Sequence, residues 1–228
     1  MNLRFRKETK HLVKSLIVII LGMLLFCECR CESGEEKISG GEKINGEIVS
    51  VKYGSGYDSW QEAYGAYITE SYCEGNEFKY SLIYLDEDAQ PELYVETNSS
   101  AGGEQVLTFY KNELNILKLS RLGSKHIPGK GLIYNNCGHM DYYPVYIYKL
   151  YEGAFYKIRE GIWGGLDWKD GFEFTEEGEL DYQYEWEGER YSEQEFYSEI
   201  DKIFPRDEGI HPEEWYTYQE MLEILKDG

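Results

Sequence analysis

Basic residues are few in this sequence. Its 228 residues hold 23 Lys and Arg against 43 Asp and Glu, so the formal net charge is −20. Proteins that bind nucleic acid place Lys and Arg on the phosphates, so this balance argues against a nucleic-acid partner. It also argues against docking of the folded part on an anionic membrane surface.

Recognised catalytic motifs are also missing. The sequence has no P-loop, no dinucleotide-binding fingerprint, no Gly-x-Ser-x-Gly elbow and no His-Glu-x-x-His pair. Acidic residues are so numerous that carboxylate pairs arise by chance, and spacing alone does not identify the pair that a glycosidase needs. A hydrolase acting on cell-wall or dietary polymer therefore stays an alternative without assigned catalytic residues.

The apolar run at residues 16–26 is too short to span a bilayer, which takes ~20 residues. It follows a segment with five basic residues and a single acidic one, Glu8. A basic segment followed by a short apolar run predicts a signal peptide at residues 1–26. The alternative is an uncleaved anchor that extends back to Leu12, with Lys14 reaching the membrane edge.

Cysteine is scarce, and three of the five cysteines follow the apolar run, at Cys27, Cys29 and Cys31. The first resembles the acylated Cys of a bacterial lipoprotein signal in position, although Phe26 stands where a small residue is expected. We predict lipidation at Cys27, with the membrane as partner through this anchor. Residues 27–47, rich in Glu, Lys, Gly and Ser, then form a flexible tether.

The other two cysteines are Cys73 and Cys137. An extracellular location permits a disulfide between them. The sequence does not place their Cα atoms within bridging distance, so two free, half-buried thiols are the alternative.

Residues 48–228 read as one extracellular α+β domain. Asp58 or Ser59 is expected to cap a helix that ends near Cys73. The capping box Ser192–Glu195 and Pro212, in a first helical turn, predict two helices near the C-terminus. Strands are expected at 79–85, 93–97, 106–110, 114–119, 132–135, 144–151, 155–159, 172–175 and 180–186. The predicted fold is an N-terminal helix, an antiparallel β-meander of about seven to nine strands and two C-terminal helices, with helices covering one side or the ends of the sheet.

An acidic turn joins the first two expected strands. Asp86, Asp88 and Glu92 fit the acidic positions of a calcium-binding loop, but Tyr84 and Ala89 replace its first ligand and its glycine. Because calcium takes 6–8 oxygen ligands, we interpret this segment as a solvated turn, with weak Ca²⁺ binding as the alternative. No other cofactor is expected.

Tyrosine is abundant, with 22 residues. Residues 161–168 read as a glycine-flanked loop that carries Trp163 and Trp168, and we predict that these side chains, with Tyr143 and His139, contact a ligand. The alternative is that Tyr fills strand positions, which favour it. Cys137 and His139 lie close in the sequence, but no third group is specified to orient a catalytic pair.

Several segments carry a family resemblance: residues 80–93, Gly102-Gly103, 107–110, 136–140 and Trp186-Glu187-Gly188. Together they resemble a group of predicted lipoproteins and secreted proteins of anaerobic Gram-positive bacteria, over most of residues 57–226. The resemblance implies a cell-surface location and no catalytic residues. The leading hypothesis is a lipid-anchored module that binds a glycan, a peptide or a surface protein; an accessory lipoprotein without a small ligand is a further alternative.

Overall fold

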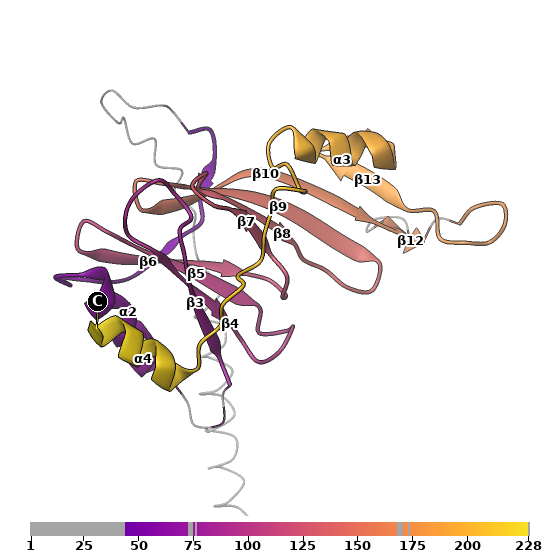
Figure 1. Cartoon of the computed structure of the whole chain (residues 1–228). Coiled ribbons are helices and arrows are strands. Elements are labelled where there is room, and N and C mark those ends of the chain that lie inside the picture. The colour runs from indigo at the N-terminus through magenta and orange to yellow at the C-terminus, as the bar shows by residue number, and fades with distance from the viewer. Residues whose placement is uncertain (1–43, 73–74, 76, 168–170, 173, 228) are drawn as a thin grey trace, which may run out of the picture. The chain divides into compact units, whose positions relative to one another are not determined.

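Two large antiparallel sheets make up most of the structure. The computed structural model describes residues 44–72, 75, 77–167, 171–172 and 174–227. One sheet has the strand order β2-β6-β5-β4-β3; the other has the order β14-β13-β10-β9-β8-β7, with β1 paired to β10, and β11 pairs with β12 (Figure 1). The strands are β1 Glu47–Ile48, β2 Val51–Ser55, β3 Lys79–Ile83, β4 Glu92–Glu96, β5 Glu104–Tyr110, β6 Glu113–Leu119, β7 Lys125–Ile127, β8 Leu132–Asn136, β9 Tyr142–Tyr151, β10 Ala154–Gly164, β11 Leu166–Asp167, β12 Gly171–Phe172, β13 Gln183–Trp186 and β14 Glu189–Tyr191.

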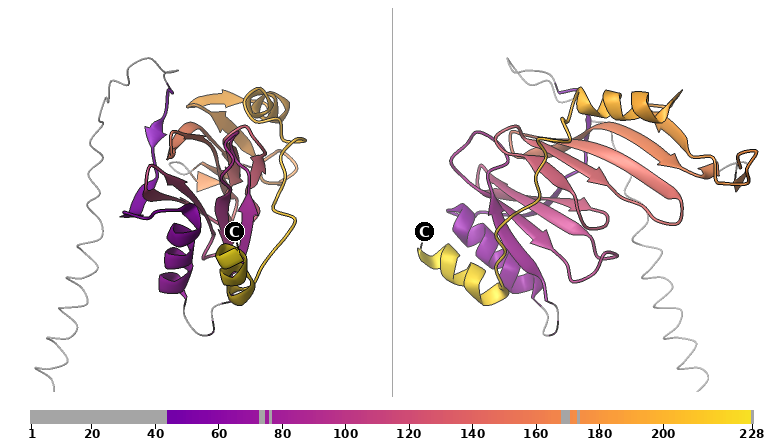
Figure 2. Two further views of the ribbon diagram at one scale, coloured as in Figure 1. Left: turned by 60° about the vertical axis from the view of Figure 1, so that its left-hand side comes forward. Right: turned by 45° about the vertical axis from the view of Figure 1, so that its right-hand side comes forward.

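The α+β class is confirmed, but the single meander is wrong. The described residues form more strands than expected, and most of these strands belong to two large sheets that pack face to face. Helices α2 (Trp60–Ser71) and α4 (Tyr218–Asp227) pack on the outer face of the β2–β6 sheet, and α3 (Glu193–Asp201) packs on the outer face of the other sheet. Figure 2 shows α2 and α4 on one side of the strands and α3 on the opposite side.

The reason for two sheets is visible in β4, which is apolar on both faces. Leu93 and Val95 point toward α2 and α4, whereas Tyr94 points toward the second sheet. Side chains alternate between the two faces of a strand, so a continuous apolar run requires cover on both sides. The predicted single sheet, with helices covering one side or its ends, is therefore wrong for the central strands.

Two hairpin turns join strands that the sequence predicts in succession. Lys111 and Asn112, between β5 and β6, and Glu152 and Gly153, between β9 and β10, all have positive φ, as two-residue hairpin loops require. The predicted strand at 180–186 is shorter, because β13 begins at Gln183. Gln183 pairs with Gly164, the last residue of β10, so residues 180–182 lie beyond the strand that they would pair with.

The helix caps follow the sequence. The apolar stripe predicted after Ser59 is the buried face of α2, and the Ser59 side chain accepts a hydrogen bond from the Glu62 backbone N–H. Ser192 and Glu195 form the predicted capping box of α3. These side chains supply hydrogen-bond partners to backbone N–H groups that a helix leaves unpaired at its start.

The second C-terminal helix begins later than Pro212 predicts. Thr217 and Glu220 exchange hydrogen bonds as a capping box, so α4 starts at Tyr218. Residues 205–217, which we call the strap, are mostly extended instead. Ile210 bridges His126 on the edge strand of one sheet, and Tyr216 bridges Tyr80 on the edge strand of the other. The strap therefore covers part of an exposed edge on each sheet.

Several predictions lie outside the described residues. They are the signal peptide, the lipidation of Cys27, most of the tether, the pairing of Cys73 and the role of Trp168. These stay predictions.

Candidate functional site

The predicted ligand-binding residues Tyr143 and Trp163 lie side by side in the second sheet. They are directly paired on β9 and β10, and their rings stack with centroids 4.1 Å apart and planes at 17°. Trp163 is in turn paired with Tyr184 of β13, which is paired with Tyr191 of β14. We call these four half-exposed residues the aromatic row. Trp163 thus lies in a strand and not in the loop that the sequence analysis predicted, because β10 continues to Gly164.

Stacking in the aromatic row covers ring faces. The rings of Trp163 and Tyr184 are also nearly parallel, at 9° with centroids 6.3 Å apart. Trp163, Tyr184 and Tyr191 pack against the core beneath α3, and the indole N–H of Trp163 is buried without a hydrogen-bond partner among the described residues. Aromatic cross-strand pairs of this kind stabilise a sheet. Stacking therefore covers one face of the Tyr143 ring and one face of the Trp163 ring.

The turn before β9 presents more exposed groups, and we call Met140, Asp141 and Tyr182 the hairpin tip. Met140 and Asp141 have φ angles of 54° and 61°, in a turn closed by the bridge between His139 and Tyr142. Met140 is 77 % exposed and Tyr182 is 41 % exposed. The Tyr182 hydroxyl donates to Asp141 Oδ1 at 3.2 Å, and its ring meets Trp163 edge-on. The predicted residue His139 is exposed beside this tip.

Cys137 lacks the features of a nucleophile. Its side chain is buried, and its Sγ lies 3.6 Å from the carbonyl oxygen of Pro144. Burial raises the pKa of the thiol, whereas an activated cysteine needs a lowered pKa. The structure therefore supports the interpretation of this cysteine as a packed side chain.

The acidic turn is a hydrogen-bonded loop in the structure. Asp86 Oδ1 accepts from the Asp88 backbone N–H at 3.0 Å, and Asp88 Oδ1 accepts from the Gln90 backbone N–H at 2.7 Å. Glu92 turns inward and is only 2 % exposed; it accepts hydrogen bonds from the Leu85 backbone N–H and the Thr108 hydroxyl. Desolvation raises the pKa of Glu92 to about 8. Asp86 and Asp88 therefore bond to backbone N–H groups within the turn, whereas the Glu92 carboxylate forms its hydrogen bonds in the protein interior.

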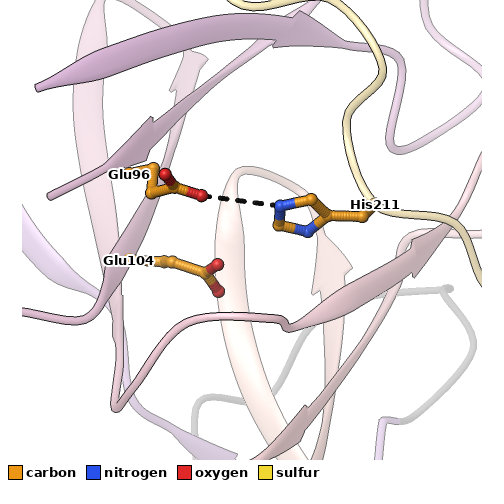
Figure 3. A group of neighbouring side chains, drawn as sticks. All are labelled: Glu96, Glu104 and His211. Carbon is orange, nitrogen blue, oxygen red and sulfur yellow. Dashed lines mark ion pairs between the residues drawn. The ribbon is translucent and has the colours of Figure 1, made fainter. Parts of the chain in front are cut away.

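Glu96, Glu104 and His211 form a further group, which no motif in the sequence indicates (Figure 3). Glu96 ends β4, Glu104 begins β5, and the two are directly opposite in register. His211 reaches them from the strap. One ligand atom from each residue lies within 4.8 Å of the others. The group is therefore assembled from two adjacent strands and a distant segment.

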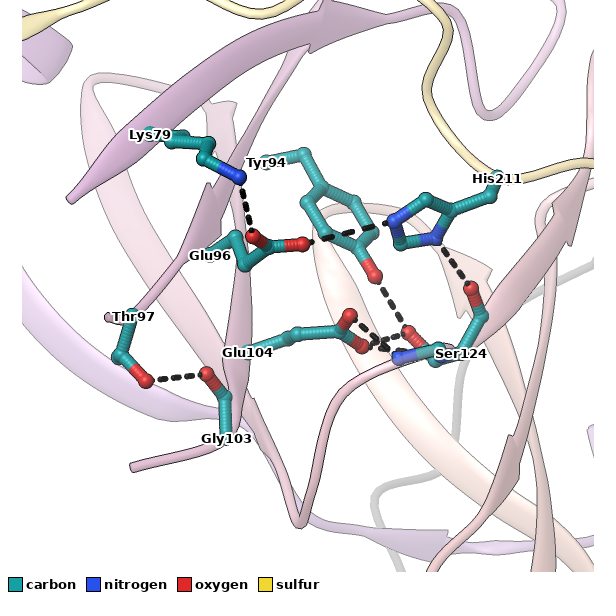
Figure 4. A network of polar contacts seen from close by, with 9 residues as sticks. Lys79, Tyr94, Glu96, Thr97, Gly103, Glu104, Ser124 and His211 are labelled. Carbon is teal, nitrogen blue, oxygen red and sulfur yellow. Dashed lines mark hydrogen bonds and ion pairs between the residues drawn. The ribbon is translucent and has the colours of Figure 1, made fainter. Parts of the chain in front are cut away.

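Hydrogen bonds hold Glu104 in one orientation. The residue is 1 % exposed, and its carboxylate accepts from the backbone N–H of Gly123 at 2.7 Å, the backbone N–H of Ser124 at 3.0 Å and the Ser124 hydroxyl (Figure 4). Among the described residues it forms no ion pair with Lys or Arg. Glu96 differs, since the Lys79 ammonium lies 3.0 Å from its Oε1.

Ser124 also orients His211. The Nδ1 atom of His211 lies 3.0 Å from the Ser124 carbonyl oxygen, and its Nε2 lies 3.6 Å from Glu96 Oε2. A carbonyl only accepts hydrogen bonds, so Nδ1 carries a proton. The Ser124 hydroxyl in turn contacts the Tyr94 hydroxyl at 2.5 Å. Ser124 thus orients both Glu104 and His211, and the Tyr94 hydroxyl contacts the Ser124 hydroxyl.

A second histidine lies near the group. His126 is 2 % exposed, and its Nδ1 has no hydrogen-bond partner among the described residues. Desolvation, with a smaller contribution from His211, lowers the pKa of His126 to about 4. His126 is therefore neutral at physiological pH and adds no positive charge near His211.

Comparison with known proteins finds no matching family model, no similar curated protein and no similar solved structure. The resemblance to secreted proteins and lipoproteins of Gram-positive bacteria therefore stays a prediction. Among the helices in the described part of the chain, none combines the length and the apolar character needed to cross a membrane.

Proposed function

We propose that this chain is a binding module of the cell exterior, anchored through a lipid on Cys27, whose hairpin tip binds a peptide segment of a surface or secreted partner. The observation that carries the proposal is the exposure of Met140 in a left-handed turn. Positive φ costs an ordinary side chain energy, and glycine would fit there without that cost. A large apolar side chain in this position gains nothing from burial, because it is 77 % exposed.

The chemistry of the tip suits a peptide. Met adapts its shape to different partners, and Tyr is enriched at protein interfaces. Asp141 and the Tyr182 hydroxyl add hydrogen-bonding groups beside the apolar surface. The aromatic row favours a peptide over a glycan, because Tyr143 and Trp163 cover one face of each other's ring and leave less flat surface for a sugar ring.

Charge complementarity indicates a basic peptide. The chain carries a net charge of −20; Asp141 belongs to the tip, and Asp181 precedes Tyr182 in the sequence. Opposite charge on the partner speeds encounter and excludes acidic competitors. We therefore expect Lys or Arg next to an apolar residue in the bound segment.

Binding has more support than hydrolysis. One depression of about 440 Å³ lies between α2 and α4, and Glu62 is the single carboxylate in its lining. A glycosidase needs two carboxylates at a defined separation across its substrate. The Glu96–Glu104–His211 group offers a carboxylate pair, but Glu104 is buried and hydrogen-bonded to the backbone.

The test is an array of peptides and glycans probed with the full chain in detergent. We expect basic, apolar-containing peptides to bind, and we expect Tyr182→Ser and Met140→Ser to reduce binding at least tenfold. Tyr84→Ser is the matched control, because Tyr84 is an exposed tyrosine (58 %) in the acidic turn of the other sheet. Glycan binding alone, or equal binding by all variants, would contradict the proposal.

A further inference from the structure

The separation of the three side chains suits a single bound ion. Zn²⁺ binds His nitrogen and carboxylate oxygen at about 2.0–2.2 Å, so two ligands of a tetrahedral ion lie about 3.3–3.6 Å apart. His211 Nε2 and Glu96 Oε2 are already 3.6 Å apart, and all three ligand atoms lie within 4.8 Å of one another.

The orientation of the His211 ring suits a metal ligand. Because Nδ1 donates to the Ser124 carbonyl, the neutral ring has an unprotonated Nε2. That lone pair faces a carboxylate oxygen of Glu96, which also carries lone pairs. Two acceptors face each other favourably only when a proton or a metal cation lies between them. A carbonyl that accepts from the second ring nitrogen is also the usual support of a metal-bound histidine.

The negative charge of the group is only partly compensated by basic side chains among the described residues. Glu96 and Glu104 are directly opposite on neighbouring strands, an arrangement that destabilises a sheet when the charges are alike. Lys79 compensates Glu96, but Glu104 has no Lys or Arg partner among the described residues. Ser124 and Gly123 instead hold its carboxylate by hydrogen bonds, as outer residues hold the ligands of a metal.

We propose that Glu96, Glu104 and His211 bind a divalent transition-metal ion, with Zn²⁺ as the expected occupant. One nitrogen and two carboxylate ligands match the three-ligand zinc site, in which a fourth position stays open. Calcium is disfavoured because it takes 6–8 oxygen ligands. The side chains of Glu96 and His211 are 15 % and 36 % exposed, so the fourth position faces solvent. This proposal does not depend on the function proposed for the hairpin tip.

The test is calorimetric titration of Zn²⁺ into the full chain in detergent, after metal has been removed with a chelator. Cysteines at 27–31 can bind Zn²⁺ themselves, so exposed thiols are alkylated first. We expect one ion per chain. We expect His211→Ala and Glu104→Gln to lower the affinity at least ~100-fold, beyond the ~10–100-fold loss typical of an outer-residue change. His139→Ala removes an exposed histidine outside the group and should leave the affinity unchanged.

Two further measurements distinguish loss of metal binding from misfolding. Co²⁺ replaces Zn²⁺ in such sites and reports its ligands by visible absorption, and circular dichroism checks the fold of each metal-free variant. If His211→Ala fails to fold, Glu96→Gln replaces it, with an expected loss of affinity of at least tenfold. Absence of Zn²⁺ binding by the wild type at millimolar metal would overturn the proposal, and so would unchanged affinity in the folded variants. In that case a protonated His211 would be the cation between the carboxylates.

Discussion

Glu96 and Glu104 lie directly opposite each other on β4 and β5, yet only Glu96 has a basic partner. The carboxylate of Glu104 is buried and fixed by backbone N–H groups, and the strap brings His211 toward the pair. Two like charges in this register oppose folding unless a cation joins them. Several measurable consequences follow from this relationship and from the hairpin tip.

Without metal, the two glutamates should differ in their effect on stability. Glu104→Gln is expected to cost about 1–3 kcal/mol, because the new amide N–H₂ faces backbone donors that then lack an acceptor. Glu96→Gln loses a partly exposed ion pair and should cost no more than about 1 kcal/mol. Urea unfolding of both metal-free variants measures the difference. A larger loss at Glu96 would contradict the role given to Glu104.

Glu92 should make stability fall as the pH rises. Desolvation raises its folded-state pKa from 4.5 to about 8, so the folded state holds a proton that the unfolded state releases. Its contribution is complete below about pH 4.5 and is lost as the pH rises through about 8. Glu92→Gln should remove this fall, so the variant gains stability relative to wild type between pH 5 and about pH 8. Denaturant unfolding across this range gives the difference between the two chains, which isolates Glu92 from other titrating groups. A constant difference would contradict the prediction.

Met140→Gly should raise the stability of the fold and weaken partner binding. Glycine adopts positive φ without strain, so the free energy of unfolding should rise by about 0.5–1 kcal/mol. Partner binding should fall, because the exposed apolar side chain is lost. Thermal unfolding and the peptide array measure the two effects on the same preparation. Loss of stability would indicate that the Met140 side chain contributes to packing in the folded state.

Trp163→Ala should act mainly on stability. The indole stacks on Tyr143 and packs against the core beneath α3, and loss of a large aromatic side chain costs about 3–5 kcal/mol when it is fully buried. We expect about 2–3 kcal/mol for this half-exposed ring, measured by urea unfolding. Tyr182→Ser is the control and should change stability by less than about 1 kcal/mol. Equal effects would contradict the separation of the aromatic row from the hairpin tip.

A lipid on Cys27 would place the chain in the membrane fraction. The proposed acylation at Cys27 would supply the membrane affinity, so Cys27→Ala should move the protein from the membrane fraction to the soluble fraction. Cys29→Ala is the control, since only the first cysteine is expected to be acylated. Fractionation and immunoblotting provide the measurement. Unchanged membrane association of Cys27→Ala would contradict lipid anchoring at this residue.

Much of the local structure could be predicted from the sequence. Ser59, Ser192 and Glu195 act at helix starts through contacts within a few residues, and the Lys111-Asn112 turn does the same for a hairpin. The division into two sheets depends on which strands are covered on both faces, and neighbouring residues do not specify that.

The Glu96–Glu104–His211 group could not be predicted from the sequence either, because it also depends on contacts between distant segments. No short spacing links the three residues, because the strap that delivers His211 is far along the chain from β4 and β5. Pro212 indicated a helix where the strap is mostly extended, since the bridges of Ile210 and Tyr216 to two sheet edges hold this segment open. The opposition of two glutamates could be found only after the register of β4 and β5 was established.

The most direct test of the metal site is a crystal of the full chain soaked in Zn²⁺, with diffraction data collected on both sides of the zinc absorption edge. We expect one anomalous peak surrounded by Glu96, Glu104 and His211, with the ion about 2.0–2.2 Å from a ligand atom of each. The peak should be absent at this position in crystals of His211→Ala. A wild-type map without a peak among these three side chains would contradict the account.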